Sequence, residues 1–102
     1  MQCAVTAGCV EYMGCYREDG NRMLGAVWRQ GDTMTHGLCF KLCSRGGHKY
    51  AALQISKQCF FGDSINIFRY PKKPESDCNR PCRGNTSEMC GGTWKNSLYM
   101  LF

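Results

Sequence analysis

The chain has 102 residues, of which 43% are hydrophobic, 21% are charged and nine are cysteine, with a formal net charge of +5. This length allows one domain with one core and excludes large enzyme folds. A domain of this size buries about 60 to 65% of its unfolded surface and is marginally stable without cross-links. Nine cysteines in so short a chain are typical of secreted, disulfide-stabilised scaffolds. We therefore expect the protein to reside in an oxidising compartment.

Neither a membrane span nor a leader is visible in the sequence. No run of about eighteen apolar residues occurs, and the N-terminus lacks the charged-then-apolar layout of a signal peptide, so we expect a leader to have been removed. The basic excess favours anionic partners but is modest for a nucleic-acid binder. An oxidised extracellular chain rarely meets single-stranded nucleic acid, so no nucleic-acid partner is expected.

Five segments are predicted to form regular structure. In chain order they are a strand at 12–16, a helix at 35–45, and strands at 50–55, 58–61 and 97–102. The strand segments are short, rich in aromatic and aliphatic residues, and mostly bounded by Gly, Ser or Asp.

The helix is indicated by its periodicity and its ends. Its core-facing side carries Leu38, Cys39, Leu42 and Cys43. Asp32, Thr33 or Thr35 can accept hydrogen bonds from its first amides, and Gly46 follows its last turn.

Two long segments, 19–33 and 62–90, are rich in Gly, Asn, Asp, Pro and Arg, so we expect irregular chain held by cross-links. The predicted fold class is α+β: a small disulfide-rich domain with one main helix packed on a short twisted antiparallel sheet with long irregular loops. Residues 1–11 are predicted to be an N-terminal arm with two extra cysteines, and residues 12–102 the domain itself.

An ordered set of motifs runs through nearly the whole chain: GCYRED, MTHGLC with CFKLC, YAALQISKQCFFG, CNRPC, EMCGG and the final LYMLF. In this order, the motifs resemble the WSC domain, a Cys-rich extracellular module. The resemblance implies a compact helix-and-sheet fold with four disulfides, as in fungal cell-wall sensors and Kremen. It also implies carbohydrate binding as the usual assigned role.

Three disulfides follow from the resemblance: Cys15 with Cys78, Cys39 with Cys59, and Cys82 with Cys90.

The fourth family bridge would join Cys43 to a cysteine two residues after Cys59, but this chain has Phe61 there. Cys3 and Cys9 are additions to the family pattern, and either can replace the missing partner and close the arm onto the helix. Because nine is odd, one of Cys3, Cys9 and Cys43 stays unassigned, either as an unpaired thiol or as an intermolecular cysteine in a homodimer.

Carbohydrate recognition needs exposed aromatic faces and planar polar groups. The rings expected in the core are Tyr16, Tyr50, Phe60 and Tyr99. The candidate ligand-binding residues lie in polar or Gly-rich segments and are Trp28, Arg29, Phe68, Arg69, Tyr70, Trp94 and Lys95.

Basic residues in the irregular segments can form a face for sulfate, carboxylate or phosphate groups. They are Arg29, Arg69, Lys72, Lys73, Arg80, Arg83 and Lys95. An anionic polysaccharide would suit such a face, and ordinary solvation is the alternative. Separately, Asn85-Thr86-Ser87 is an acceptor sequence for N-glycosylation at Asn85.

Catalytic and metal-binding patterns are not recognised. The carboxylates, His36 and His48 form no nucleophile–base or paired-carboxylate arrangement, and the Cys-x3-Cys spacings are loose for zinc. We therefore predict no enzyme activity, no cofactor and no metal. The leading hypothesis is a secreted module that binds carbohydrate through exposed aromatics and basic loops. The alternative is a protein-interaction or extracellular-matrix structural module.

Overall fold

A computed structural model describes residues 2–4, 8–25 and 27–102. Besides the helix α1 (His36–Arg45) and a short 3-10 turn, η1 (Glu75–Asp77), these residues form strands. The strands are β1 (Gln2–Ala4), β2 (Gly8–Arg17), β3 (Val27–Gln30), β4 (Tyr50–Gln54), β5 (Gln58–Gly62), β6 (Lys72–Lys73), β7 (Pro81–Cys82), β8 (Asn85–Met89) and β9 (Lys95–Leu101).

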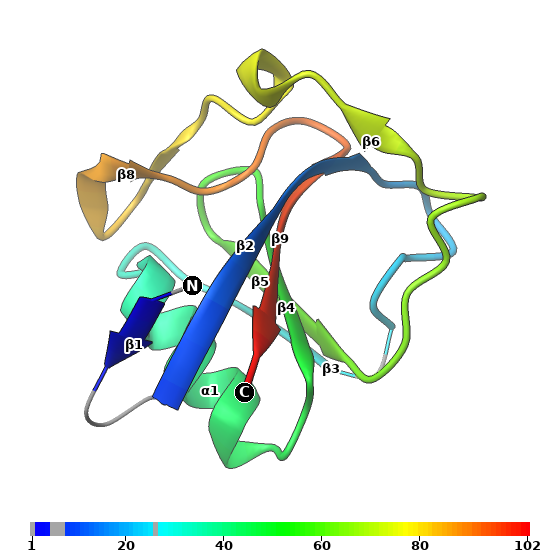
Figure 1. The fold of residues 1–102 in the computed structure, drawn as a ribbon. Helices are drawn as coiled ribbons and strands as arrows, with labels where there is room; N and C mark the ends of the chain where they lie inside the picture. Colours follow the sequence, from blue (N-terminus) through cyan, green and yellow to red (C-terminus); the bar gives the residue numbers. More distant parts are fainter. Residues whose placement is uncertain (1, 5–7, 26) are drawn as a thin grey trace.

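The main sheet is antiparallel and has the order β1-β2-β9-β4-β5-β3, with β6 also pairing to β2. The C-terminal strand β9 therefore lies in the middle of the sheet, between β2 and β4 (Figure 1). Strands β7 and β8 form a separate hairpin. β2 begins at Gly8, inside the expected arm of residues 1–11.

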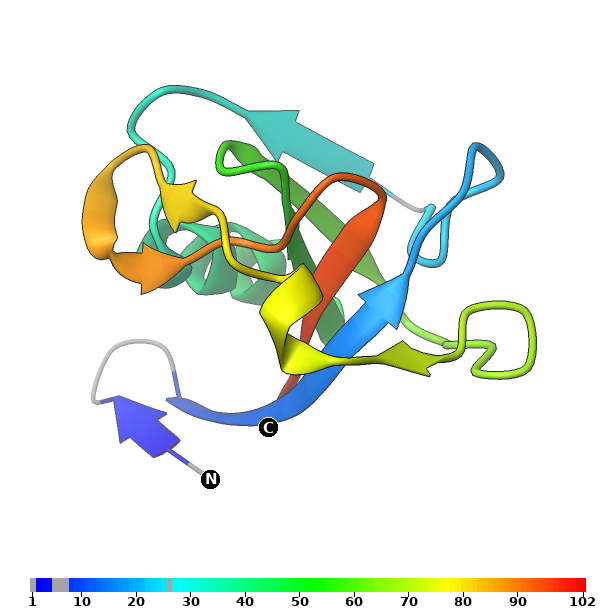
Figure 2. The same ribbon diagram turned by 90° about the horizontal axis from the view of Figure 1, so that it is seen from above.

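Both faces of the sheet are covered. Leu53 and Phe61 face α1 in one core cluster, whereas Ala52, Phe60 and Leu98 belong to a second cluster on the other face. Figure 2 shows α1 on one side of the strands and the connecting segments 18–25 and 63–71 on the other. This double burial explains why β4 and β5 are nearly continuous apolar runs rather than alternating ones.

The predicted α+β class is confirmed, with one helix and a mostly antiparallel sheet. Thr35 caps α1, because its Oγ1 accepts from the Leu38 amide at 3.0 Å. The predicted strands at 12–16, 50–55, 58–61 and 97–102 correspond to β2, β4, β5 and β9 within a few residues. Of the rings expected in the core, Tyr16 and Phe60 are buried, and Tyr50 and Tyr99 pack partly buried against it.

The segments 19–33 and 62–90, which were expected to be irregular, also contain short regular elements. The first segment contains β3, and the second contains β6, η1, β7 and β8. β3 and β8 are short and mostly exposed, so they lack the apolar pattern that marks a strand in a sequence. Their pairing with β5 and β7 makes them strands.

Three disulfides cross-link the elements, two of them between elements far apart in the sequence and one within a hairpin. Cys15–Cys78 ties β2 to the residue after η1, Cys39–Cys59 ties α1 to β5, and Cys82–Cys90 closes the β7–β8 hairpin. These are the three pairs that the family resemblance implied. Cys9 is also disulfide-bonded, and the residue opposite it in the β1–β2 register is Cys3, whose side chain lies outside the described part of the structure.

Cys43 is a free, buried cysteine, so the expected closure of the arm onto the helix through Cys43 is wrong. Its side chain is fully buried between α1 and β4, where the thiol donates to the carbonyls of Tyr50 and His48 at 3.3 and 3.4 Å. A homodimer linked through Cys43 is incompatible with this burial.

The Cys43 thiol is expected to be unreactive in the native protein. Burial raises its pKa to about 12, so almost no thiolate exists at pH 8. Addition of a thiol-specific chromogenic reagent should label Cys43 only after denaturant unfolds the domain. Rapid labelling of Cys43 in the native state, located by peptide mapping, would contradict this burial.

Candidate functional site

A hollow of about 190 Å³ opens on the sheet face opposite α1. It is lined by Arg22, Gln54, Ile55, Gln58, Thr93 and Trp94. Gln54 ends β4 and Gln58 begins β5, and the two are paired in register directly after the Ala52–Phe60 pair on this face. We refer to this cavity, together with its six lining residues, as the hollow.

Aromatic rings flank the hollow. Trp28 and Trp94 expose 50% and 49% of their surface, whereas the neighbouring ring of Phe60 is buried. Trp28 stacks on Phe60, with ring centroids 5.9 Å apart and planes at 21°. The Arg22 guanidinium lies over both the Phe60 and Trp94 rings, at 4.9 and 5.5 Å from their centroids. The two tryptophans are thus connected through one cation–π arrangement.

An ion pair with the buried side chain of Glu18 holds Arg22 in place. The Glu18 carboxylate lies 3.6 Å from the Arg22 guanidinium and accepts the Met23 amide at 2.7 Å. Its side chain is fully buried, and this burial raises the pKa of Glu18. The ion pair therefore fixes the guanidinium and compensates its charge within the domain.

The turn that carries Trp94 is held at both of its central residues. The Trp94 carbonyl accepts the Glu18 amide at 2.9 Å, and the Arg80 guanidinium donates to Thr93 Oγ1 at 2.9 Å. Gly92 and Lys95 exchange backbone hydrogen bonds across the turn. Trp94 is therefore presented from a fixed backbone rather than from a loose loop.

The backbone around the hollow is strained. Among the described residues, non-glycine positive φ occurs at Arg22, Ile55, Ser56 and Trp94. Three of these four line the hollow, and Ser56 follows Ile55 in the β4–β5 turn. A positive φ is unfavourable for a β-branched residue such as Ile55. Residues with strained backbone are found most often at functional sites.

The predicted ligand residues fall into separate places. Trp94 lines the hollow, Trp28 stacks on Phe60 beside it, and Lys95 is next to Trp94 in the chain. Arg29 is opposite Cys59 in the β3–β5 register, so it lies on the other face of β3 from Trp28. Phe68, Arg69 and Tyr70 belong to the separate segment 63–71.

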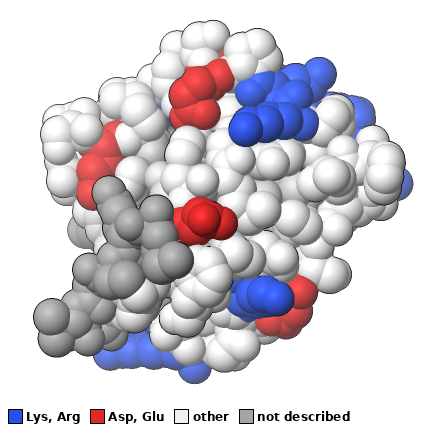
Figure 3. All heavy atoms as spheres, viewed as in Figure 1, with Lys and Arg blue, Asp and Glu red and all other residues white. Residues whose placement is uncertain are grey.

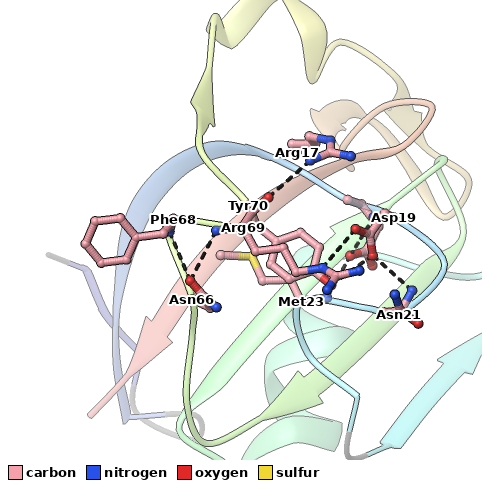
Figure 4. A network of polar contacts seen from close by, with 9 residues as sticks. Arg17, Asp19, Asn21, Met23, Asn66, Phe68, Arg69 and Tyr70 are labelled. Atoms are coloured by element: carbon pink, nitrogen blue, oxygen red, sulfur yellow. Dashed lines mark hydrogen bonds and ion pairs between the residues drawn. The ribbon is translucent and has the colours of Figure 1, made fainter.

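The segment that carries Phe68 is built around Asn66 and Asp19 (Figure 4). Asn66 Oδ1 accepts the amides of Phe68 and Arg69 at 3.1 Å, while Asp19 accepts from Arg69 Nε at 3.1 Å and from the Tyr70 hydroxyl at 2.8 Å. The expectation that Tyr70 is an exposed ring is wrong, because this bond and the second core cluster bury it to 3% exposure. The Phe68 ring is 94% exposed.

The basic residues do not all present free charge. Arg69 pairs with Asp19, and Arg83 pairs with Asp32 at 2.8 Å. Figure 3 shows basic side chains gathered near β6, which contains Lys72 and Lys73, and acidic side chains spread elsewhere over the same face.

Sequence reasoning did not single out five residues of the hollow as site residues, namely Arg22, Gln54, Ile55, Gln58 and Thr93. The available signal was weak: Gln54 and Gln58 are polar residues next to apolar strands, on either side of a short turn. The glutamines adjoin only when β4 and β5 pair.

Comparison with known proteins decides the family, because the WSC domain model matches residues 12–92. The chain belongs to the WSC family.

In three relatives, the segment similar to this WSC domain is a small part of a longer protein. Xylosyltransferase oxt of Drosophila pseudoobscura pseudoobscura is 36% identical over 89 residues, which cover 85% of this chain and 10% of that protein. A WSC domain-containing protein of Arthroderma benhamiae is 33% identical over 91 residues, covering 87% and 10%.

Kremen protein 1 of Xenopus laevis is 30% identical to the WSC domain over 88 residues, covering 85% of this chain and 20% of that protein. The chain therefore spans between a tenth and a fifth of the length of these relatives. The WSC domain is a non-catalytic module, and it forms a small part of the xylosyltransferase.

A metal site in this WSC domain has little support from the described residues. The one group of close ligand atoms is His36 with Cys82 and Cys90, all within 4.8 Å. The two sulfurs are bonded to each other, so they offer no thiolate ligand. Within the described ranges, no helix has the length and apolar character needed to cross a membrane.

Proposed function

We propose that this WSC domain is a secreted, non-enzymatic module that binds carbohydrate at the hollow and its flanking rings Trp28 and Trp94. The single observation that carries the proposal is the pair of half-exposed tryptophans joined through Arg22 beside a hollow lined by side-chain amides. Ring faces suit the C–H faces of a sugar, and amides suit its hydroxyls. The disulfides support an oxidising, extracellular setting.

The fixed geometry of the site also supports binding. The turn of Trp94 is anchored by Glu18 and Arg80, and Arg22 is anchored by the Glu18 carboxylate. A surface that is ordered before the ligand arrives loses little conformational entropy on binding. Binding by such a small site is expected to be weak for one sugar unit and stronger for a repeating polymer.

Trp94→Ala and Trp28→Ala are each expected to weaken polysaccharide binding by about tenfold or more while changing the melting temperature little. Each ring is about half exposed, so its loss removes ligand contact more than core packing. Affinity would be measured by calorimetry and by tryptophan fluorescence against laminarin, xylan, mannan and heparin. Phe68→Ala is the matched control, because it removes an exposed ring from the separate segment 63–71.

Two outcomes would redirect the proposal. Loss of binding in Phe68→Ala, with both tryptophan variants unaffected, would move the site to Phe68, Arg69 and the segment 63–71. Failure of the native protein to bind any polysaccharide would favour the alternative of a protein-interaction module, for which Phe68 offers a rigidly presented, 94% exposed ring.

N-glycosylation at Asn85 is a further part of the proposal. Asn85 is exposed at the start of β8, and Ser87 Oγ donates to its Oδ1 at 2.7 Å. Expression in a glycosylating eukaryotic host is expected to add an N-glycan that peptide mapping locates at Asn85 and that Asn85→Gln removes. An unmodified Asn85 peptide from that host would contradict the assignment.

A further inference from the structure

Gln54 is a buried amide with an acceptor that no other described residue satisfies. Its side chain ends β4 and lines the hollow, and the residue is only 4% exposed. The Oε1 atom is buried and has no hydrogen-bond partner. A buried polar atom without a partner costs stability, so native structures keep few of them without a functional reason. Gln54 thus carries an unpaired acceptor at the edge of a cavity large enough to admit part of a ligand.

The charges at the hollow point to an uncharged ligand. Arg22 is the one ionisable residue in the lining, and the Glu18 carboxylate beneath it compensates its charge at 3.6 Å. Its guanidinium face is occupied by Phe60 and Trp94. Arg80 stands beside Thr93 with its charge in solvent, where salt screens it. A sulfate or carboxylate would therefore gain little inside the hollow.

We propose that the hollow selects an uncharged, hydroxyl-bearing sugar and that Gln54 determines this specificity by accepting a hydrogen bond from a sugar hydroxyl at Oε1. The inference rests on the proposed function and deepens it. The Gln54 acceptor needs an O–H donor from the ligand, and a neutral sugar ring supplies several hydroxyls beside a face that can lie on Trp94. A sugar lacking a donor at this position leaves the buried acceptor unpaired, so discrimination is steep.

The test is Gln54→Met, which keeps the length of the side chain and removes its polar atoms. Affinity for the neutral polysaccharide that the native protein binds, among laminarin, xylan and mannan, is expected to fall by about tenfold. The melting temperature is expected to stay the same or rise, because the variant removes an unsatisfied buried acceptor. A merely structural glutamine would give the opposite pattern, with lower stability and unchanged affinity.

The control is Lys41→Met, a change to the same side chain at an exposed residue of α1, on the other side of the sheet from the hollow. It is expected to change affinity by less than about twofold. Equal losses in the two variants would overturn the assignment of specificity to Gln54.

The charge prediction is tested with salt and with heparin. Neutral-polysaccharide affinity is expected to change less than about twofold between about 0.05 and about 0.5 M NaCl, whereas any heparin binding should fall with salt. Tighter binding of heparin than of every neutral polysaccharide would overturn the inference. Binding that requires Trp94 but ignores Gln54→Met would overturn it while leaving the proposed function intact. No polysaccharide binding at all would overturn both.

Discussion

Replacing Cys15 and Cys78 together by serine is expected to lower the free energy of unfolding by about 4 kcal/mol, according to the loop-entropy relation. The disulfide joins β2 to the residue after η1 over a sequence separation of 63. A domain of this size has only about 5 to 15 kcal/mol in total, so the melting temperature should fall by about 20 °C. Chemical denaturation followed by circular dichroism would measure the loss.

The matched control is the double replacement of Cys82 and Cys90, which closes a separation of only 8 residues. The same relation gives a loss of about 2 to 3 kcal/mol for this pair. The ratio of the two losses is more informative than either value, because both variants remove one buried disulfide. Equal losses, or a larger loss from the hairpin pair, would contradict loop closure as the source of the stability.

Gly91→Ala is expected to destabilise the domain by about 3 kcal/mol or more, since it combines overpacking with a left-handed backbone. Gly91 has φ +69, and a Cβ there would lie 2.1 Å from the Leu53 carbonyl oxygen and 2.8 Å from Gln54 Cα. These neighbours are backbone atoms of β4 and cannot turn aside as a flexible side chain would. Thermal unfolding would measure the effect.

Any folded Gly91→Ala protein should also bind carbohydrate poorly, because the added methyl group displaces the backbone at Gln54. Gly20→Ala is the control: nothing lies within 4 Å of its Cβ position, and it should change stability by less than about 0.5 kcal/mol. Normal stability and normal binding of Gly91→Ala would show that β4 is not packed tightly against residue 91.

Gly91 and the Glu18–Arg22 pair both hold the residues of the hollow against the strands of the main sheet. The Gly91 amide donates to Ser97 Oγ at 3.0 Å, which fixes the start of β9 just after the Trp94 turn. In the same turn, the Trp94 carbonyl accepts a hydrogen bond from the amide of Glu18, the residue that directly follows β2. The exposed residues of the hollow are therefore positioned by buried groups, so mutations beneath the surface should alter binding as well as stability.

The helix and the core strands are the parts of the fold that local sequence predicts well. Thr35 and Gly46 mark the ends of α1, and their roles depend on neighbours only a few residues away. β4 and β5 are apolar runs because both of their faces are buried. β3 was missed for the opposite reason: its residues are largely exposed, and only pairing with β5 makes it a strand.

Of the residues at the candidate site, only the two tryptophans were predicted from the sequence. Trp28 and Trp94 lie in polar or Gly-rich segments, and this local composition indicates exposure. The same reasoning failed for Tyr70, because its burial depends on Asp19, which lies 51 residues earlier. Arg22 likewise gave no signal, since its role follows from Glu18 and from rings on distant segments.

The sequence by itself determined the fold class, the helix, the core strands and the family, because capping, periodicity and cysteine order are local or linear properties. Only the tertiary structure decided that Cys43 stays free, that Tyr70 is buried, and that the Gln54 acceptor beside the hollow has no partner among the described residues. Each of these depends on which distant atoms fill the space around a side chain. That packing exists only once β2, β9, β4 and β5 have assembled.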